Sequence, residues 1–306
     1  MPAETGFISH GTRCAAWHLP AESDALTGLR GRPCVVMGHG FGATRDAGLL
    51  PFAERFATAG AEVLVFDYRG YGTSDGMPRQ NVAHLRHRQD YHAAIEHARG
   101  LPGVDRDRIV LWGSSYSGGH VVAVAAADGQ VAAVISQGAA MDGLTALLEI
   151  GRYAGVGQLL TLTAHGLLDV IGALLGQPPH LIPVVGPPGS LAAITAEGAE
   201  SGYRMIMGPT FRNEMCARGA LIIPLNRPVT AAARLRCPIF LVVAEDDNIC
   251  PPAAVRAVAA KAGAGAEVLS LRSGHFDIYG GEMFERSTAA QVDFLTRTLA
   301  VAPMAV

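Results

Sequence analysis

The stretch Arg108-Ile-Val-Leu-Trp-Gly-Ser-Ser-Tyr-Ser-Gly-Gly-His120 carries the residues best suited to covalent chemistry. Its β-branched and apolar run, Ile109 to Trp112, predicts a short buried strand. The next residues, Gly113 to Gly118, are close to the G-x-S-x-G pattern, in which a serine lies on a strained strand-to-helix turn with its hydroxyl above the sheet. Small residues must flank that serine, and Ser117 stands where the second glycine is usual. The stretch therefore predicts a serine nucleophile.

Two serines compete for this role. Ser115 is the predicted nucleophile, because Gly113 then follows the strand directly and Tyr116 begins the helix. Ser117 is the alternative, although Ser115 would then have to replace the first glycine. A third interpretation is a turn that ends a strand and has no chemical role, which a motif this short does not exclude. Other loops of the chain must distinguish these interpretations.

Three further loops follow apolar, strand-like runs. Gly38-His-Gly-Phe-Gly42 follows Cys34 to Met37, and its glycines allow backbone amides to point into a cleft. Ala244-Glu-Asp-Asp-Asn-Ile-Cys-Pro251 follows another buried run and supplies carboxylates. His275 follows Glu267 to Leu271. The chain thus presents serine, acid and histidine in that order, each directly after a predicted strand.

These four loops together resemble those of the α/β-hydrolase superfamily. The resemblance implies that Ser115 attacks an acyl carbon, His275 is the general base, and Asp247 orients the imidazole. Asp246 stays an alternative for the acid, because only geometry identifies a triad member. The backbone amides of Phe41 and Tyr116 are expected to form the oxyanion hole. The elbow is most similar to those of the X-Pro dipeptidyl peptidase and cocaine esterase branch.

The function implied is a serine hydrolase that cleaves a carboxylic ester, lactone or thioester with an apolar acyl or alcohol part. Acyltransferase, peptidase or carbon-carbon bond hydrolase activity on the same scaffold is the alternative, and so is a ligand-binding protein without turnover. The chemistry requires no metal or organic cofactor. Four residues near the predicted loops are expected to line the substrate pocket: His39, Met141, Ile249 and Phe276.

The alternation of strands and helices predicts a mostly parallel central sheet with helices on both faces. It stops near Asp142, and residues 143–235 instead show apolar helical runs and a proline-rich crossing. We expect a core domain made of 1–142 and 236–306, with a helical cap, 143–235, inserted before the acid-bearing strand. Gly155 to Gly176 is apolar enough to resemble a membrane span, but Asp169 and His165 in its middle favour a lid helix.

Composition excludes several other classes of protein. The 306 residues are 49% hydrophobic and 17% charged, with a formal net charge of −3, and the basic residues are not clustered. Neither nucleic-acid binding nor a polybasic membrane surface is indicated. The five cysteines include no C-x-x-C pair, so no zinc site or disulfide framework is expected. We expect a cytoplasmic protein whose partner is a small apolar substrate, and the sequence leaves a homodimer open.

Three further motifs have interpretations other than catalysis by the serine. Gly38, Gly40 and Ala43 match the dinucleotide-binding pattern G-x-G-x-x-A, which requires a helix directly after the turn. Asp67 and Arg69 are expected to pin their loop as a bidentate pair. His84 and His87 share one face of a predicted helix, where interleaved arginines favour a solvated face over a metal site. None of these motifs changes the predicted function.

Overall fold

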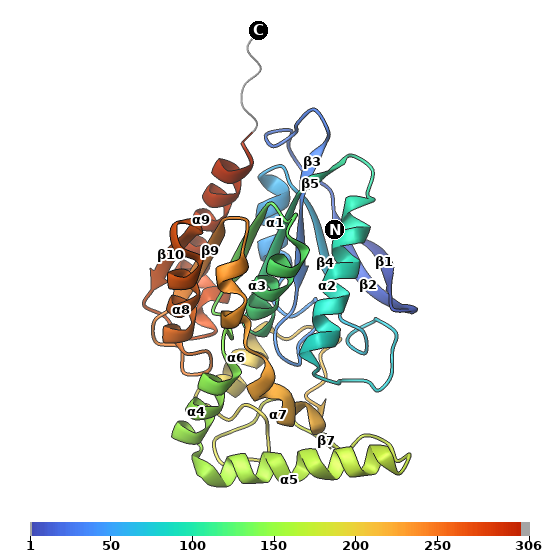
Figure 1. Ribbon diagram of the computed structural model, residues 1–306, viewed down its shortest axis with the longest axis vertical. Coiled ribbons are helices and arrows are strands. Elements are labelled where there is room, and N and C mark those ends of the chain that lie inside the picture. Colours follow the sequence, from blue (N-terminus) through green and yellow to red (C-terminus); the bar gives the residue numbers. More distant parts are fainter. Residues whose placement is uncertain (1, 301–306) are drawn as a thin grey trace.

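One sheet organises the molecule, and the computed structural model describes residues 2–300. Its strand order is β1-β2-β4-β3-β5-β6-β9-β10 (Figure 1). β1 is antiparallel to β2 and β2 is antiparallel to β4, whereas every other neighbouring pair is parallel. The strands are β1 (Ala3–Ser9), β2 (Thr12–Leu19), β3 (Arg32–Gly38), β4 (Glu62–Phe66), β5 (Val104–Ser114), β6 (Ala133–Gln137), β9 (Ile239–Ala244) and β10 (Ala266–Leu271).

Helices cover both faces of this sheet because its central strands are apolar on both sides. Val36 packs with one hydrophobic core and its neighbour Val35 with the other, as the alternation of side chains along a strand requires. One core joins the sheet to α2 (His84–Arg99), α3 (Tyr116–Asp128) and α8 (Pro252–Ala262). The other joins it to α1 (Leu50–Thr58) and α9 (Gly281–Leu299). The predicted fold class is confirmed.

Most of the elements between β6 and β9 gather at one end of the molecule, where α5 runs across it (Figure 1). They include the segment predicted as a cap, and its boundaries at 143 and 235 stay a prediction. The helices are α4 (Gly143–Tyr153), α5 (Gly155–Leu174), α6 (Ala199–Ile206) and α7 (Arg218–Ile222). Short elements complete the segment: β7 (Leu181–Ile182), β8 (Met215–Cys216), η1 (Ile223–Leu225), η2 (Pro228–Thr230) and η3 (Ala232–Arg234).

Helix α5 is long and apolar enough to cross a membrane, with 22% of its most apolar 18-residue window buried. One apolar helix of this kind does not indicate a membrane protein. Asp169 of α5 has a fully buried side chain and receives hydrogen bonds from Arg218 Nε at 2.6 Å and Arg218 Nη2 at 2.7 Å. This bidentate contact joins α5 to α7. A buried carboxylate requires a charged partner of this kind, and here α7 of the same protein supplies it.

Two expectations about the core require correction. His84 and His87 do not form a solvated face, because both are buried in the folded protein, with exposed fractions of 7% and 2%. The dinucleotide pattern also lacks its structural context, because the residues after β3 form turns and α1 begins only at Leu50. The glycines of that turn serve the site described next.

Candidate active site

Ser115 lies on a sharp turn between β5 and α3. Its φ of 58° and ψ of −121° fall in a region that residues other than glycine seldom occupy, so the surrounding structure must hold it there. The turn brings strand and helix so close that a Cβ at Gly113 would lie 2.4 Å from the Ser117 carbonyl oxygen. Glycine is therefore required at position 113. A strained serine on a strand-to-helix turn is typical of a nucleophile elbow.

Ser117 has a different environment. Its side chain is fully buried, and its Oγ lies 2.7 Å from the Gly38 carbonyl oxygen, to which it donates. The same Oγ accepts a hydrogen bond from the Ser114 backbone N–H at 2.9 Å. A serine thus replaces the usual glycine here because its hydroxyl links the elbow to the end of β3. These contacts describe a structural hydroxyl.

Three side chains predicted to act together do meet in the structure. His275 Nε2 lies 3.1 Å from Ser115 Oγ, and His275 Nδ1 lies 2.6 Å from Asp247 Oδ2. All three side chains are buried. Burial opposes protonation of His275, but the adjacent Asp247 carboxylate outweighs it and raises the pKa of His275 well above its usual value. The arrangement stabilises an imidazolium beside the serine.

The two candidate acids differ in position. Asp247 lies behind the imidazole, and its Oδ1 accepts hydrogen bonds from the backbone N–H groups of Ile249 at 2.8 Å and Cys250 at 2.7 Å. Asp246 is exposed and lines a surface depression. The loop after β9 therefore aims one carboxylate at His275 and the other toward solvent.

Cys250 adds a thiol to this cluster. Within the described residues, Asp247, Cys250 and His275 form a group of possible metal ligands whose ligand atoms lie within 4.8 Å of one another. The facing atoms of Asp247 and His275 are already joined by a hydrogen bond. Burial raises the pKa of the Cys250 thiol, which keeps it protonated. The set is thus better arranged for proton transfer than for holding a metal.

The backbone around Ser115 offers two hydrogen-bond donors. Tyr116 is the first residue of α3, where N–H groups have no partner within the helix. Phe41 follows Gly40, and the chain passes so close there that a Cβ at Gly40 would lie 3.2 Å from Ser115 Cβ. Within the part of the chain that the structure describes, neither N–H donates a hydrogen bond. Two free N–H groups beside the Ser115 hydroxyl are suited to bind an oxyanion.

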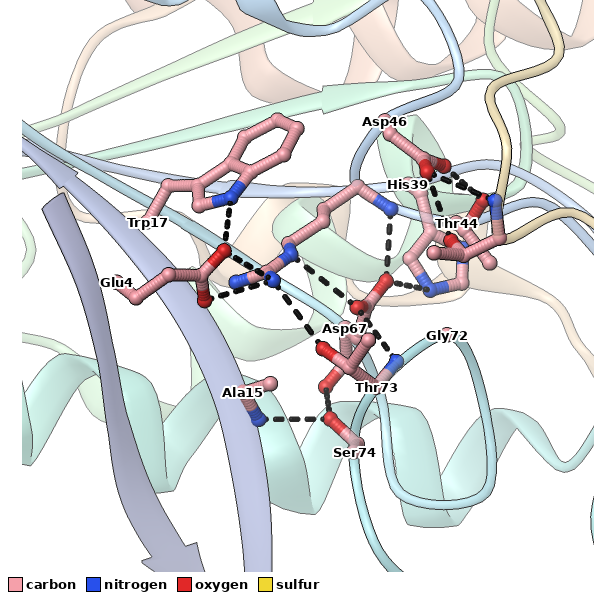
Figure 2. Close-up of polar contacts among 12 residues, drawn as sticks. Glu4, Ala15, Trp17, His39, Thr44, Asp46, Asp67, Gly72, Thr73 and Ser74 are labelled. Carbon is pink, nitrogen blue, oxygen red and sulfur yellow. Dashed lines mark hydrogen bonds and ion pairs between the residues drawn. The ribbon is translucent and has the colours of Figure 1, made fainter. Parts of the chain in front are cut away.

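The Asp67 carboxylate makes several polar contacts with the loop that follows β3 and includes Phe41 (Figure 2). Arg45 donates its backbone N–H to Asp67 Oδ1 at 2.7 Å, and its Nε lies 3.3 Å from Asp67 Oδ2. Gly72 completes the fit, because a Cβ there would lie 2.2 Å from Asp67 Oδ2. The predicted Asp67–Arg69 pair is therefore wrong. Arg69 instead pairs with Asp90 of α2, since the loop directs its guanidinium toward that helix.

A pocket lined mostly by apolar side chains opens at Ser115. The pocket lies between core loops and the segment that carries α4, and it is lined by Phe41, Ser115, Tyr116, Ala140, Asp142, Gly143, Ala146, Ile150, Tyr153, Ala193, Ile194, Ile223, Asn226, Ile249 and Cys250.

Of the four residues expected to line the pocket, Ile249 does so. Phe276 lies in the neighbouring depression beside His275. His39 and Met141 line neither cavity. His39 is fully buried next to Tyr68, and burial lowers its pKa to about 4. Sequence reasoning missed the lining from α4 and from the segments near Ile194 and Ile223, because cap residues carry no motif that relates them to the serine.

Comparison with known proteins agrees with this geometry. The model of the alpha/beta hydrolase fold family matches residues 33–282, which is most of the chain. The chain belongs to the α/β-hydrolase fold family. The match spans both parts of the core and the inserted segment between them, so the family expected from the four loops is confirmed.

Relatives of this hydrolase show what its scaffold is used for. The quorum-quenching protein AidA of Acinetobacter baumannii is 37% identical over 302 residues, covering 98% of this chain and 96% of the relative. The thiohydrolase aneE of Aspergillus aculeatus is 41% identical over 116 residues, covering 35% of this chain and 36% of the relative. The polyketide transferase af380 of Aspergillus fumigatus is 28% identical over 277 residues, covering 89% and 91%.

Proposed function

We propose that this protein is a serine hydrolase that cleaves a carboxylic ester, lactone or thioester with an apolar acyl or alcohol part. The observation that carries the proposal is the pair of contacts at His275, 3.1 Å to Ser115 Oγ and 2.6 Å to Asp247 Oδ2. The apolar pocket at Ser115 supports an apolar substrate. The names of the quorum-quenching and thiohydrolase relatives are consistent with it.

The reaction follows from these positions. Ser115 Oγ attacks the acyl carbon while His275 Nε2 takes its proton, and Asp247 holds the imidazole in the required tautomer. The N–H groups of Phe41 and Tyr116 bind the oxyanion, and each such donor typically contributes about 10²–10³ in rate. His275 returns the proton to the leaving alcohol or thiol. Water then attacks the acyl-enzyme with His275 as base, which releases the acid.

The test is replacement of the nucleophile. Ser115→Ala is expected to abolish turnover of p-nitrophenyl esters, acyl thioesters and acyl lactones, together with labelling by a fluorophosphonate probe, because no other hydroxyl contacts His275 Nε2 among the described residues. Ser117→Ala is the control and is expected to keep the label, since Ser117 Oγ is bonded to Gly38 and Ser114. Full labelling of the Ser115 variant would contradict the proposal.

Acyl transfer is the second candidate, favoured by the similarity to a polyketide transferase. The acyl-enzyme is the same, and an alcohol, amine or thiol replaces water as the acceptor. Product analysis with an added acceptor separates the two reactions. The likeness of the elbow to the X-Pro dipeptidyl peptidase and cocaine esterase branch stays a prediction, which an X-Pro p-nitroanilide substrate tests directly.

For partners, we propose a second copy of this chain, with α5 as the contact surface. Leu160, Leu167 and Leu174 recur every seven residues on α5 and are exposed by 66%, 51% and 82%. Such spacing forms one apolar seam along a helix. The helix contains no lysine or arginine, unlike helices that bind membrane surfaces. A matching helix face is thus a better partner than a membrane. The cytoplasmic location is likewise proposed.

A further inference from the structure

Asn226 places an amide group in the mostly apolar wall of the substrate pocket, which also includes Asp142. Asn226 lines the pocket among alanines and isoleucines and is 2% exposed. Its backbone is fixed, because its carbonyl oxygen accepts from the Gly143 N–H at 2.8 Å and its N–H donates to the Ile223 carbonyl at 3.0 Å. The fit is so close that a Cβ at Gly143 would lie 1.9 Å from the Ile223 oxygen. The amide is therefore held at one place in the wall.

The orientation of this amide is fixed by Arg88 of α2. Arg88 Nη2 donates to Asn226 Oδ1 at 2.6 Å. A guanidinium can only donate, so the atom that it contacts must be the amide oxygen. The Asn226 NH₂ group then lies on the other side of the amide. Among the residues that the structure describes, none receives a hydrogen bond from this nitrogen, and the Tyr116 hydroxyl that lines the same pocket is likewise without a partner.

The surroundings strengthen the amide as a donor. The Arg88 charge at the oxygen end draws electron density away from the nitrogen, and burial keeps water from screening it, as the lowered pKa of Arg88 indicates. The Tyr116 side chain lines the same pocket, and burial raises the pKa of its hydroxyl while Arg88 and Asn226 oppose that rise. Polar groups thus gather at one end of the pocket. Among them, the Asn226 NH₂ group is a hydrogen-bond donor that donates no bond within the described chain.

We infer that the acyl part of the substrate carries an oxygen acceptor, a carbonyl or a hydroxyl, that binds Asn226 Nδ2. This inference rests on the proposed function. A plain alkyl chain would cover the Asn226 NH₂ group without pairing it, and an unpaired buried donor is costly. A chain with an oxygen at this position pairs the donor while its remaining carbons contact the isoleucines. The pocket therefore selects oxygenated aliphatic acyl groups over plain ones.

The kinetic test compares N-acetylcysteamine thioesters of one chain length, unsubstituted or with a keto or hydroxyl group moved along the chain. For at least one position we expect kcat/KM to exceed that of the plain thioester about 10-fold to 100-fold. Asn226→Asp keeps an oxygen for Arg88 but replaces the donor with an acceptor, so this preference is expected to disappear. Gln177→Glu makes the same amide-to-acid change at an exposed position and is expected to retain it.

A binding measurement separates this inference from the proposed function. Calorimetry with Ser115→Ala and the corresponding free acids requires no turnover. We expect the oxygenated acid to bind at least about 10-fold more tightly than the plain acid, and the advantage to vanish in Ser115→Ala/Asn226→Asp. If the oxygenated acid binds more tightly but the native protein turns over none of the thioesters, the proposed hydrolase function is overturned and the inference about Asn226 still holds. Equal binding by every acid, or a preference that Asn226→Asp leaves intact, would overturn the inference.

Discussion

At the scale of single residues, the site depends on which of two neighbouring carboxylates faces the histidine. Asp246 and Asp247 are indistinguishable by chemistry, and both follow β9 directly. The turn gives Asp247 the contact with His275 Nδ1 and two backbone N–H donors, while Asp246 faces solvent. A shift of one residue along the chain thus separates the carboxylate that contacts His275 from one that faces solvent.

This difference predicts the effect of two matched substitutions. Asp247→Asn is expected to lower kcat about 10⁴-fold, the loss seen when an asparagine imposes the wrong imidazole tautomer in a serine protease triad. Asp246→Asn is expected to leave kcat within a few-fold of native. The measurement is steady-state kinetics on a p-nitrophenyl ester. A larger loss for Asp246→Asn than for Asp247→Asn would reverse the assignment of the acid.

At the scale of elements, α2 does more than cover the sheet. Its His87 ring stacks on Tyr68 with centroids 4.1 Å apart and lies 5.5 Å from the ring of His120 on α3. His39 joins the same group through Tyr68. Burial lowers the pKa of each of these histidines, so that they are neutral at pH 7. The helices beneath the elbow therefore pack through uncharged imidazoles.

This packing predicts acid sensitivity. A histidine with a lowered folded-state pKa binds more protons when unfolded, so its contribution to stability is lost as pH falls from about 6.5. Asp67 and Asp90 act oppositely, since burial raises the pKa of both carboxyl groups, that of Asp67 to about 6, but they are fewer than the buried histidines whose pKa is lowered. His87→Phe keeps an aromatic ring against Tyr68 but removes a group that binds a proton on unfolding. The free energy of unfolding is therefore expected to fall less below pH 6.5 in this variant than in the native protein. Urea denaturation from pH 7.5 to pH 4.5 measures it, and parallel curves would contradict this account.

At the scale of the whole molecule, the core carries the proposed reacting groups and the inserted segment supplies most of the pocket wall. Ser115, Phe41 and Tyr116 come from the core loops, whereas Ala146 and Ile150 come from α4. Substrate selection can therefore vary with the insertion while the chemistry is unchanged. The same segment carries α5, whose outer face is apolar and has no cover within the described chain.

That face predicts the oligomeric state. Native protein is expected to be a dimer by size-exclusion chromatography with light scattering, and Leu167→Glu/Leu174→Glu to be a monomer, because four buried carboxylates would face one another across the seam. Leu29→Glu is the control, since Leu29 is 90% exposed and lies outside α5. Its dimer is expected to persist. A native monomer at every concentration tested would rule out this contact.

Sequence alone determined the family, the order of the elements and the serine, acid and histidine loops, because these depend on short patterns at strand ends. It could not place side chains whose partners are remote in the chain. Arg45 rather than Arg69 pairs with Asp67, and both His84 and His87 of α2 are buried. Asn226 lines the pocket, and its hydrogen bond with Arg88 orients its amide. These contacts depend on how the insertion and helices dock on the sheet, a long-range outcome that no local spacing encodes.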